Sequence, residues 1–137
     1  MALNNFSNAN FVFSLNGRVI SDWGEAANPC NEEPMNPKAT MRKGQGGNAV
    51  ALDHPNPGRR VTLSLNPGGN DSAYVQGLFN SNAVVTCSKQ QIGTLEAAVG
   101  TEGRIVNDGP VGRGGATNIT DDVYIIEFNT WSGSKGG

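Results

Sequence analysis

Two features of this chain have the residue types of acid–base catalysis: a single histidine and a pair of adjacent glutamates. His54 lies in Asp53-His54-Pro55 with no Ser or Cys close to it in the sequence, and a general base must reach the group whose proton it takes. Glu32 and Glu33 are neighbours, and side chains of neighbouring residues in an extended chain point to opposite sides. We therefore interpret His54 as a loop histidine, and we predict no catalytic residue and no enzymatic activity.

Two glycine-rich segments have partial matches to phosphate-binding motifs. Residues 44–49 match the dinucleotide pattern G-x-G-x-x-A, but that motif opens a helix, and Val50-Ala51-Leu52-Asp53 does not favour one. Residues 112–115 lack the Lys-Ser/Thr of a P-loop. With only one histidine, a histidine-rich metal cluster is excluded. The sequence therefore predicts turns at both segments, no cofactor and no metal.

The two cysteines are interpreted as reduced thiols. Residues 1–7 have neither the basic start nor the apolar core of a signal peptide, so we expect synthesis in the cytosol, where thiols stay reduced. Cys87 ends the apolar run Val84-Val85-Thr86-Cys87, which favours a small core residue over a nucleophile. No role is predicted for Cys30.

Composition favours one domain, residues 1–137, built from short strands. Charged residues make up 16% of the chain, below the roughly 25% of an average soluble domain, and 19 glycines supply turns. A net charge of −2 with scattered bases gives no support for DNA binding, which needs clustered Lys and Arg. No apolar run approaches the roughly 18 residues of a membrane span.

Alternating apolar residues predict the strands. Residues 11–15 and 18–23 alternate around Asn16-Gly17, which predicts a hairpin because both turn residues tolerate a positive φ. Residues 60–65 alternate likewise. A helix is predicted over residues 72–79, capped by Asn70 or Asp71. Further strands are predicted at residues 82–88, 94–99, 104–107 and 122–131, with a break at 100–103, a loop at 108–120 and a flexible tail at 133–137.

The sum is a mainly β fold, a β-sandwich or barrel of about seven or eight strands with one flanking α-helix. The apolar faces of these elements predict most of the core: Phe11, Phe13, Val61, Leu63, Leu65, Leu78, Phe79, Ile126 and Phe128. Trp23 is an alternative anchor for a subunit interface, where tryptophan is favoured.

Residues 24–58 form an unusually long segment with five of the seven prolines. Strand pieces at residues 40–43 and 48–52 are separated by Gly44-Gln45-Gly46-Gly47. Its glutamates come first and its bases later. A segment of this length in a small domain is usually functional or disordered: we expect it to be disordered in a monomer and ordered if it packs against other copies of the chain.

The order of these parts resembles the small tail-tube proteins of contractile bacteriophages, which share their architecture with the type VI secretion tube protein. The resemblance rests on Met1-Ala2-Leu3, Phe6-Ser7, Val19-Ile20-Ser21-Asp22-Trp23, Gly46-Gly47-Asn48-Ala49-Val50, Arg60-Val61-Thr62-Leu63-Ser64-Leu65 and a helix with Leu78-Phe79. It covers residues 1–88, and beyond them it rests on the late strand through Tyr124 and Phe128.

The resemblance implies a structural subunit of the virion that assembles into hexameric rings, stacked into a tube through which DNA passes without specific binding. Its partners would be further copies of itself and the tail sheath, baseplate and tail terminator proteins, with no membrane. Alternatives are another phage structural component, such as a tube terminator, baseplate or capsid decoration protein, or a carbohydrate-binding β-sandwich that stacks sugars on Trp23, Trp131 or Tyr124.

Two sets of residues are predicted to act in the assembly. Inter-subunit contacts are expected from the charged residues of the long segment: Glu25, Glu32, Glu33, Lys38, Arg42 and Lys43. The lumen is expected to carry the polar faces of two strands: Thr62, Ser64, Thr86 and Ser88.

Overall fold

A computed structural model describes residues 6–135, in which nine strands, one α-helix and a short 3-10 helix occur. The elements are η1 (Asn8–Asn10), β1 (Phe11–Leu15), β2 (Arg18–Ile20), β3 (Cys30–Pro34), β4 (Ala39–Lys43), β5 (Ala49–Asp53), β6 (Arg59–Leu65), α1 (Asn70–Asn80), β7 (Val84–Gln91), β8 (Ala97–Asp108) and β9 (Asp122–Ser134). Residues 1–3, on which the resemblance partly rests, lie outside the described part.

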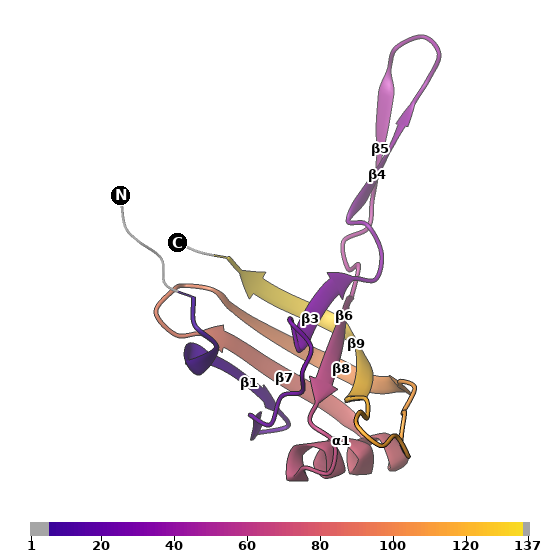
Figure 1. Ribbon diagram of the computed structural model, residues 1–137. Helices are drawn as coiled ribbons and strands as arrows, with labels where there is room; N and C mark the ends of the chain where they lie inside the picture. The colour runs from indigo at the N-terminus through magenta and orange to yellow at the C-terminus, as the bar shows by residue number, and fades with distance from the viewer. Residues whose placement is uncertain (1–5, 136–137) are drawn as a thin grey trace.

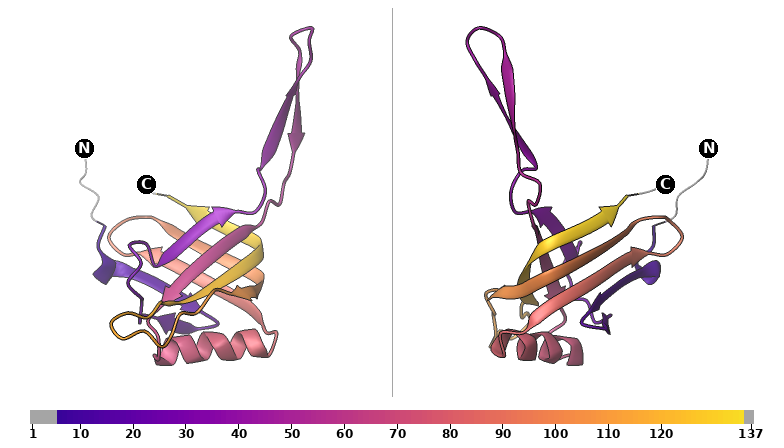
Figure 2. Two further views of the ribbon diagram at one scale, coloured as in Figure 1. Left: turned by 45° about the vertical axis from the view of Figure 1, so that its right-hand side comes forward. Right: turned by 180° about the vertical axis from the view of Figure 1, so that it is seen from behind.

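Seven of the strands form one antiparallel sheet in the order β2-β1-β7-β8-β9-β6-β3. The sheet curves around its own inner face, with α1 across one end (Figures 1 and 2). It stays open at β2 and β3, so the described residues form no closed barrel. Strands β4 and β5 pair only with each other and project from the opposite end. The predicted mainly β, sandwich-like fold with one helix is confirmed, with nine strands in place of seven or eight.

The predicted hairpin at Asn16-Gly17 is confirmed. Both residues have a positive φ, 51° at Asn16 and 83° at Gly17, which is the backbone that a two-residue turn between twisted strands requires. Strand β2 ends at Ile20 and not at residue 23, and Ile20 is the buried residue of the strand.

Trp23 closes the open side of the curved sheet. It makes an isolated bridge to Leu65 of β6, and its ring packs against Phe11 and Phe13 of β1 with centroid distances of 5.9 and 6.1 Å. Trp23 thus connects β6 through its backbone with β1 through its ring, which places its side chain in intramolecular packing.

The core fills the inner face of the sheet. Six of the nine predicted core residues are fully buried, while Phe11, Leu78 and Phe79 pack half-buried at its edge. The remaining core residues come from the other strands and α1: Leu15, Ile20, Val75, Val85, Cys87, Ile105 and Tyr124.

Both thiols are free and face this inner side. Burial is the main cause that raises the pKa of Cys30 and of Cys87 to about 12. A thiol with such a pKa is protonated at neutral pH and is a poor nucleophile. The interpretation of Cys87 as a buried core residue is confirmed.

Helix α1 starts without a side-chain cap. The residue at the N-cap position is Gly69, which has no side chain to accept a hydrogen bond. The expected cap by Asn70 or Asp71 is therefore wrong. The Asp71 carboxylate instead accepts hydrogen bonds from Arg18 Nε at 3.0 Å and from the backbone N–H groups of Ser21 and Asp22, both at 2.9 Å. It ties the helix to the end of β2.

Strand β8 is continuous where the sequence predicts two strands and a glycine turn. Gly100 and Gly103 lie within the strand, on the inner face. The Phe128 and Trp131 rings of β9 occupy the space that side chains would need at these two positions. The glycines therefore serve close packing and do not end the strand.

Replacing Gly103 with alanine should destabilise the fold, because the new Cβ would lie 2.4 Å from Phe128 Cδ1. Overpacking of this kind costs about 1–3 kcal/mol, which urea unfolding measures. The control is Gly77→Ala in α1, where a Cβ meets nothing within 4 Å and where alanine should stabilise the helix by about 0.8–1 kcal/mol. Equal stability of the two variants would contradict the packing role.

Strand β9 also runs further than predicted. It continues through Ser134, with Gly133 paired to Ala98 and Ser134 to Ala97. The expected flexible tail is therefore wrong at its first two positions, and residues 136–137 lie outside the described part.

Candidate assembly surfaces

The β4–β5 hairpin forms the middle of the long segment. Gly44-Gln45-Gly46-Gly47 turns the chain between its strands, with Gly47 at a φ of 94° and its N–H donating to Gly44 O at 3.0 Å. The segment matching a dinucleotide fingerprint is thus a hairpin turn, as predicted. At the base, His54 N donates to Lys38 O at 2.6 Å, and the His54 side chain lies in an exposed loop.

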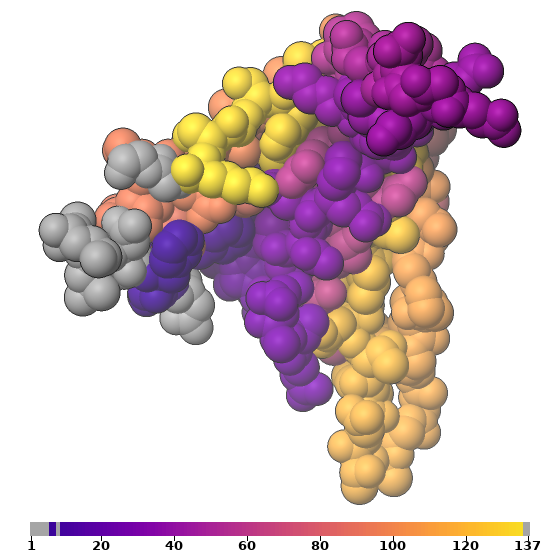
Figure 3. Space-filling view, turned by 90° about the horizontal axis from the view of Figure 1, so that it is seen from above, coloured from indigo at the N-terminus to yellow at the C-terminus, as the bar shows by residue number. Residues whose placement is uncertain are grey.

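Every residue of the hairpin from 39 to 53 is exposed, and the hairpin projects from the body (Figure 1), toward the viewer in Figure 3. Met41 is 66% exposed, Val50 56% and Leu52 51%. Register places Met41 opposite Ala51 on one face, and Arg42 opposite Val50 and Thr40 opposite Leu52 on the other. Both faces of this two-stranded ribbon therefore present apolar side chains, and two-stranded ribbons are marginally stable without a packing partner.

The bases predicted for inter-subunit contact are grouped on the hairpin, and two of the glutamates are not. Lys38, Arg42 and Lys43 are exposed on β4 or just before it. Glu32 and Glu33 instead lie on β3 in the main sheet. Glu25 is exposed in the segment before β3.

Glu32 and Glu33 form ion pairs within the chain. Glu32 Oε1 accepts from Arg59 at 3.1 Å, and Lys89 Nζ lies 3.0 Å from Glu32 Oε2, an ion pair without hydrogen-bond geometry. Glu33 and Glu127 flank Arg60 at 3.1 and 2.9 Å. These pairs join β3, β6, β7 and β9, so Glu32 and Glu33 already have partners within their own subunit.

The residues predicted to line the lumen share one face of the sheet. Thr62 and Ser64 on β6, and Thr86 and Ser88 on β7, alternate with buried residues and so face away from the core. Strands β8 and β9 lie between the two pairs. The outer face of the sheet also carries Val84, Val99 and Val106, which are 59%, 51% and 49% exposed.

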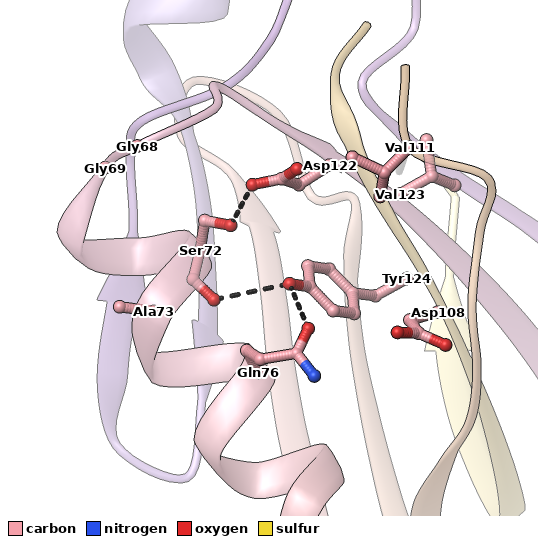
Figure 4. A pocket seen from close by; sticks show the side chains of 10 residues that line it. All are labelled: Gly68, Gly69, Ser72, Ala73, Gln76, Asp108, Val111, Asp122, Val123 and Tyr124. Carbon is pink, nitrogen blue, oxygen red and sulfur yellow. Dashed lines mark hydrogen bonds between the residues drawn. The ribbon is translucent and has the colours of Figure 1, made fainter. Parts of the chain in front are cut away.

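A third surface lies at the α1 end, opposite the hairpin (Figure 1). A pocket of about 320 Å³ opens there between the start of α1, the end of β8 and the start of β9. Figure 4 shows Ser72, Gln76 and Tyr124 turned toward one another, with Asp108 beside them. Tyr124 Oη donates to Gln76 Oε1 at 2.9 Å, Ser72 Oγ donates to Asp122, and Arg113 pairs with Asp122 at 2.6 Å.

The aromatic residues that would stack sugars in a carbohydrate-binding module are not displayed together. Tyr124 is buried, Trp23 packs on Phe11 and Phe13, and Trp131 packs against Phe128 with the Arg59 guanidinium over its ring. Within residues 6–135, no cluster of His, Cys, Asp or Glu has the arrangement of a metal site. No helix in that range has the length and hydropathy to cross a membrane.

No protein-family model and no curated protein sequence matches the chain. Solved structures do match its fold over nearly its full length. A chain of the sheath-tube complex of the extracellular contractile injection system PVC has a TM-score of 0.62 at 12% identity, covering 95% of this chain and 91% of that one. The PVC sheath/tube terminator gives 0.64 at 13%, covering 98% and 100%. The tube-terminating cap of the anti-feeding prophage gives 0.58 at 11%, covering 99% and 95%. This chain therefore has a fold found in components of contractile injection particles.

Proposed function

We propose that this chain is the tube-forming subunit of a contractile phage tail. Copies would form hexameric rings, and the rings would stack into a tube inside the sheath that conducts DNA into the host. The observation that carries the proposal is the fold likeness along the whole chain to components of a sheath-tube complex and of tube terminators. The role is structural and not enzymatic, and the location is the virion.

The exposed hairpin supports assembly. The projecting ribbon exposes apolar residues on both faces, and such surfaces mark protein interaction sites. In a stacked tube, the hairpin reaches a neighbouring copy, with Lys38, Arg42 and Lys43 among the contacts. The open edges β2 and β3 add a second means of joining subunits, because unpaired strand edges favour pairing with another chain.

The outer face of the sheet is the surface we assign to the lumen. A tube that lets DNA slide needs a wall without a strong basic stripe. Thr62, Ser64, Thr86 and Ser88 are uncharged, and Arg60 on the same face is paired with Glu33 and Glu127. The surrounding partners would be the sheath outside the tube, and the baseplate and terminator proteins at its ends.

A tube terminator is the second candidate, because a terminator and a terminating cap are among the structures that share this fold. The two roles differ in what the purified protein forms. A tube subunit polymerises into filaments, whereas a terminator stops at a single ring that binds the end of a preformed tube. Negative-stain electron microscopy distinguishes them, and a chain that stays monomeric at all concentrations contradicts both.

Reversing two charges on the hairpin should block polymerisation. In Arg42→Glu with Lys43→Glu, both substituted residues are exposed in the free subunit, so the monomer should fold with unchanged circular dichroism. We expect pelletable tubes to fall at least tenfold, because charge reversal at a contact repels its partner. The matched control exchanges the two bases, Arg42→Lys with Lys43→Arg, and should assemble. Normal tubes from the Glu variant would refute a contact role for these bases.

A further inference from the structure

The charged side chains of this protein are segregated along its long axis. Residues 35–57, the hairpin with its two legs, carry three bases and one acid. The opposite end is called here the acidic end and consists of residues 18–25, 66–76 and 108–122. It carries six acids and two bases. The remaining five acids and five bases balance. The hairpin thus has a net charge of +2 and the acidic end a net charge of −4. The remaining residues, called here the body, have a net charge of zero.

Both bases of the acidic end are already paired. Arg18 lies 3.0 Å from Asp71, and Arg113 lies 2.6 Å from Asp122. Burial acts to raise the pKa of Asp71, but the bonds from Ser21, Asp22 and Arg18 outweigh it and hold this pKa below its usual range. The carboxylate therefore remains charged.

Four acids of this end have no base within ion-pair distance in the described residues: Asp22, Glu25, Asp108 and Asp121. Three of them, Asp22, Asp108 and Asp121, line the pocket at α1 or lie next to a residue that lines it. The Asp22 carboxylate lies against Gly69, and Asp121 accepts hydrogen bonds from the N–H groups of Glu25 and Ala26. Asp108 lines the pocket itself, at the end of β8 where the chain is exposed.

Apolar side chains accompany the charges on both surfaces. The loop between β8 and β9 exposes Val111 by 55% and Ile119 by 44%, and this loop projects from the body (Figure 3). On the hairpin, Arg42 shares its face with Val50 and Leu52. Each surface therefore combines exposed apolar area with charge of the opposite sign.

We propose that the β4–β5 hairpin of one subunit docks onto the acidic end of the next subunit along the tube axis, with the Arg42 guanidinium paired to Asp108 at the pocket. The inference rests on the proposed function and adds the receiving surface and the polarity of the stack. The contact joins different surfaces of the two copies, so it repeats from one subunit to the next and extends as a filament wherever the rotation between copies does not close a ring. The neutral body offers the hairpin no comparable charge complement.

The alternative receiving surface is the pocket beside Trp23, lined by Phe6, Phe11 and Pro29. It is larger, about 430 Å³, but among the described residues that line it Glu96 is the only charged one. Binding of the hairpin to that pocket would not involve Asp108. A charge exchange between Arg42 and Asp108 therefore distinguishes the two receiving surfaces.

The test is that charge exchange in the full chain, read out by sedimentation and negative-stain microscopy at about 0.1 M salt. Arg42→Asp and Asp108→Arg should each reduce the pelleted fraction at least tenfold. The double variant restores the pair with reversed polarity and should recover the pelleted fraction to within about threefold of the unsubstituted protein. In the control, Arg42→Asp is combined with Glu102→Arg, an exposed acid of the neutral body, and should not recover. If Asp108→Arg impairs folding, Asp108→Asn should reduce the pelleted fraction by a smaller factor.

Two results would overturn the docking. One is normal tubes from folded Asp108→Arg or Asp108→Asn. The other is a folded double variant that assembles no better than the single ones. In both cases the unsubstituted chain still forms tubes, and the proposed function stands. A chain that never forms rings or tubes overturns the proposed function, and the docking with it.

Discussion

Truncating Leu63 to alanine should lower the free energy of unfolding by about 2–5 kcal/mol. Leu63 is fully buried at the middle of β6 and pairs with Cys30 of β3 and Tyr124 of β9. Three strands meet at this side chain, so they cannot collapse onto a cavity without shifting the sheet. Small domains have about 5–15 kcal/mol of stability in total, and the loss should appear as a large drop in the urea midpoint of the monomer.

The control for this truncation is Val99→Ala on the outer face of β8, where the side chain is 51% exposed. A substitution there should change stability by no more than about 0.5 kcal/mol. An unchanged urea midpoint for Leu63→Ala would mean that the inner and outer faces of β6 are exchanged, which would also remove Thr62 and Ser64 from the lumen.

Replacing Asp71 with asparagine should cost about 3 kcal/mol at neutral pH, because hydrogen bonds to a charged group are worth about 1.5–3 kcal/mol each. Asp71 is 5% exposed and accepts from Arg18, Ser21 and Asp22. An asparagine amide offers one acceptor oxygen where the carboxylate offers two. Unfolding by urea at pH 7 measures the effect, and Asp53→Asn on the exposed hairpin is the control.

The cost of Asp71→Asn should depend on pH with a definite sign. The folded-state pKa of Asp71 is lowered, so its stabilising contribution is present above the unfolded pKa of about 3.9 and is lost as pH falls through the folded value. The difference between the two proteins should therefore be constant from pH 7 to about 5 and shrink below about 4. A difference that grew on acidification would contradict the role of the charged carboxylate.

Local patterns predict the strands with clear alternation and miss the elements that distant residues determine. The Asn16-Gly17 turn and the alternation from Val61 to Leu65 are readable because both signals lie within a few residues. Gly100 and Gly103 have the local pattern of a turn, yet they continue β8 because Phe128 and Trp131 fill the space beside them. No feature near these glycines reports where those rings lie.

The candidate surfaces also contain residues that local sequence patterns reveal and residues that they do not. The sequence identifies the bases of the hairpin, since Arg42 and Lys43 are adjacent and lie between prolines and glycines. It does not reveal the ion pairs of Glu32 within the chain, because Arg59 and Lys89 meet Glu32 only once β3, β6 and β7 are folded. The acidic end is missed for the same reason, because its charges come from three separate stretches. Counting the charged residues at the end of each predicted strand would have indicated this acidic end.

The buried thiol of Cys87 offers a way to measure how often β7 opens. Cys87 is buried and protonated in the folded subunit, so an alkylating reagent at neutral pH modifies it only in molecules that have transiently opened there. Its labelling rate therefore measures the opening equilibrium of β7, with the partly buried Cys30 as the comparison. Measured before and after polymerisation, the rate gives the stability that this strand gains from neighbouring subunits.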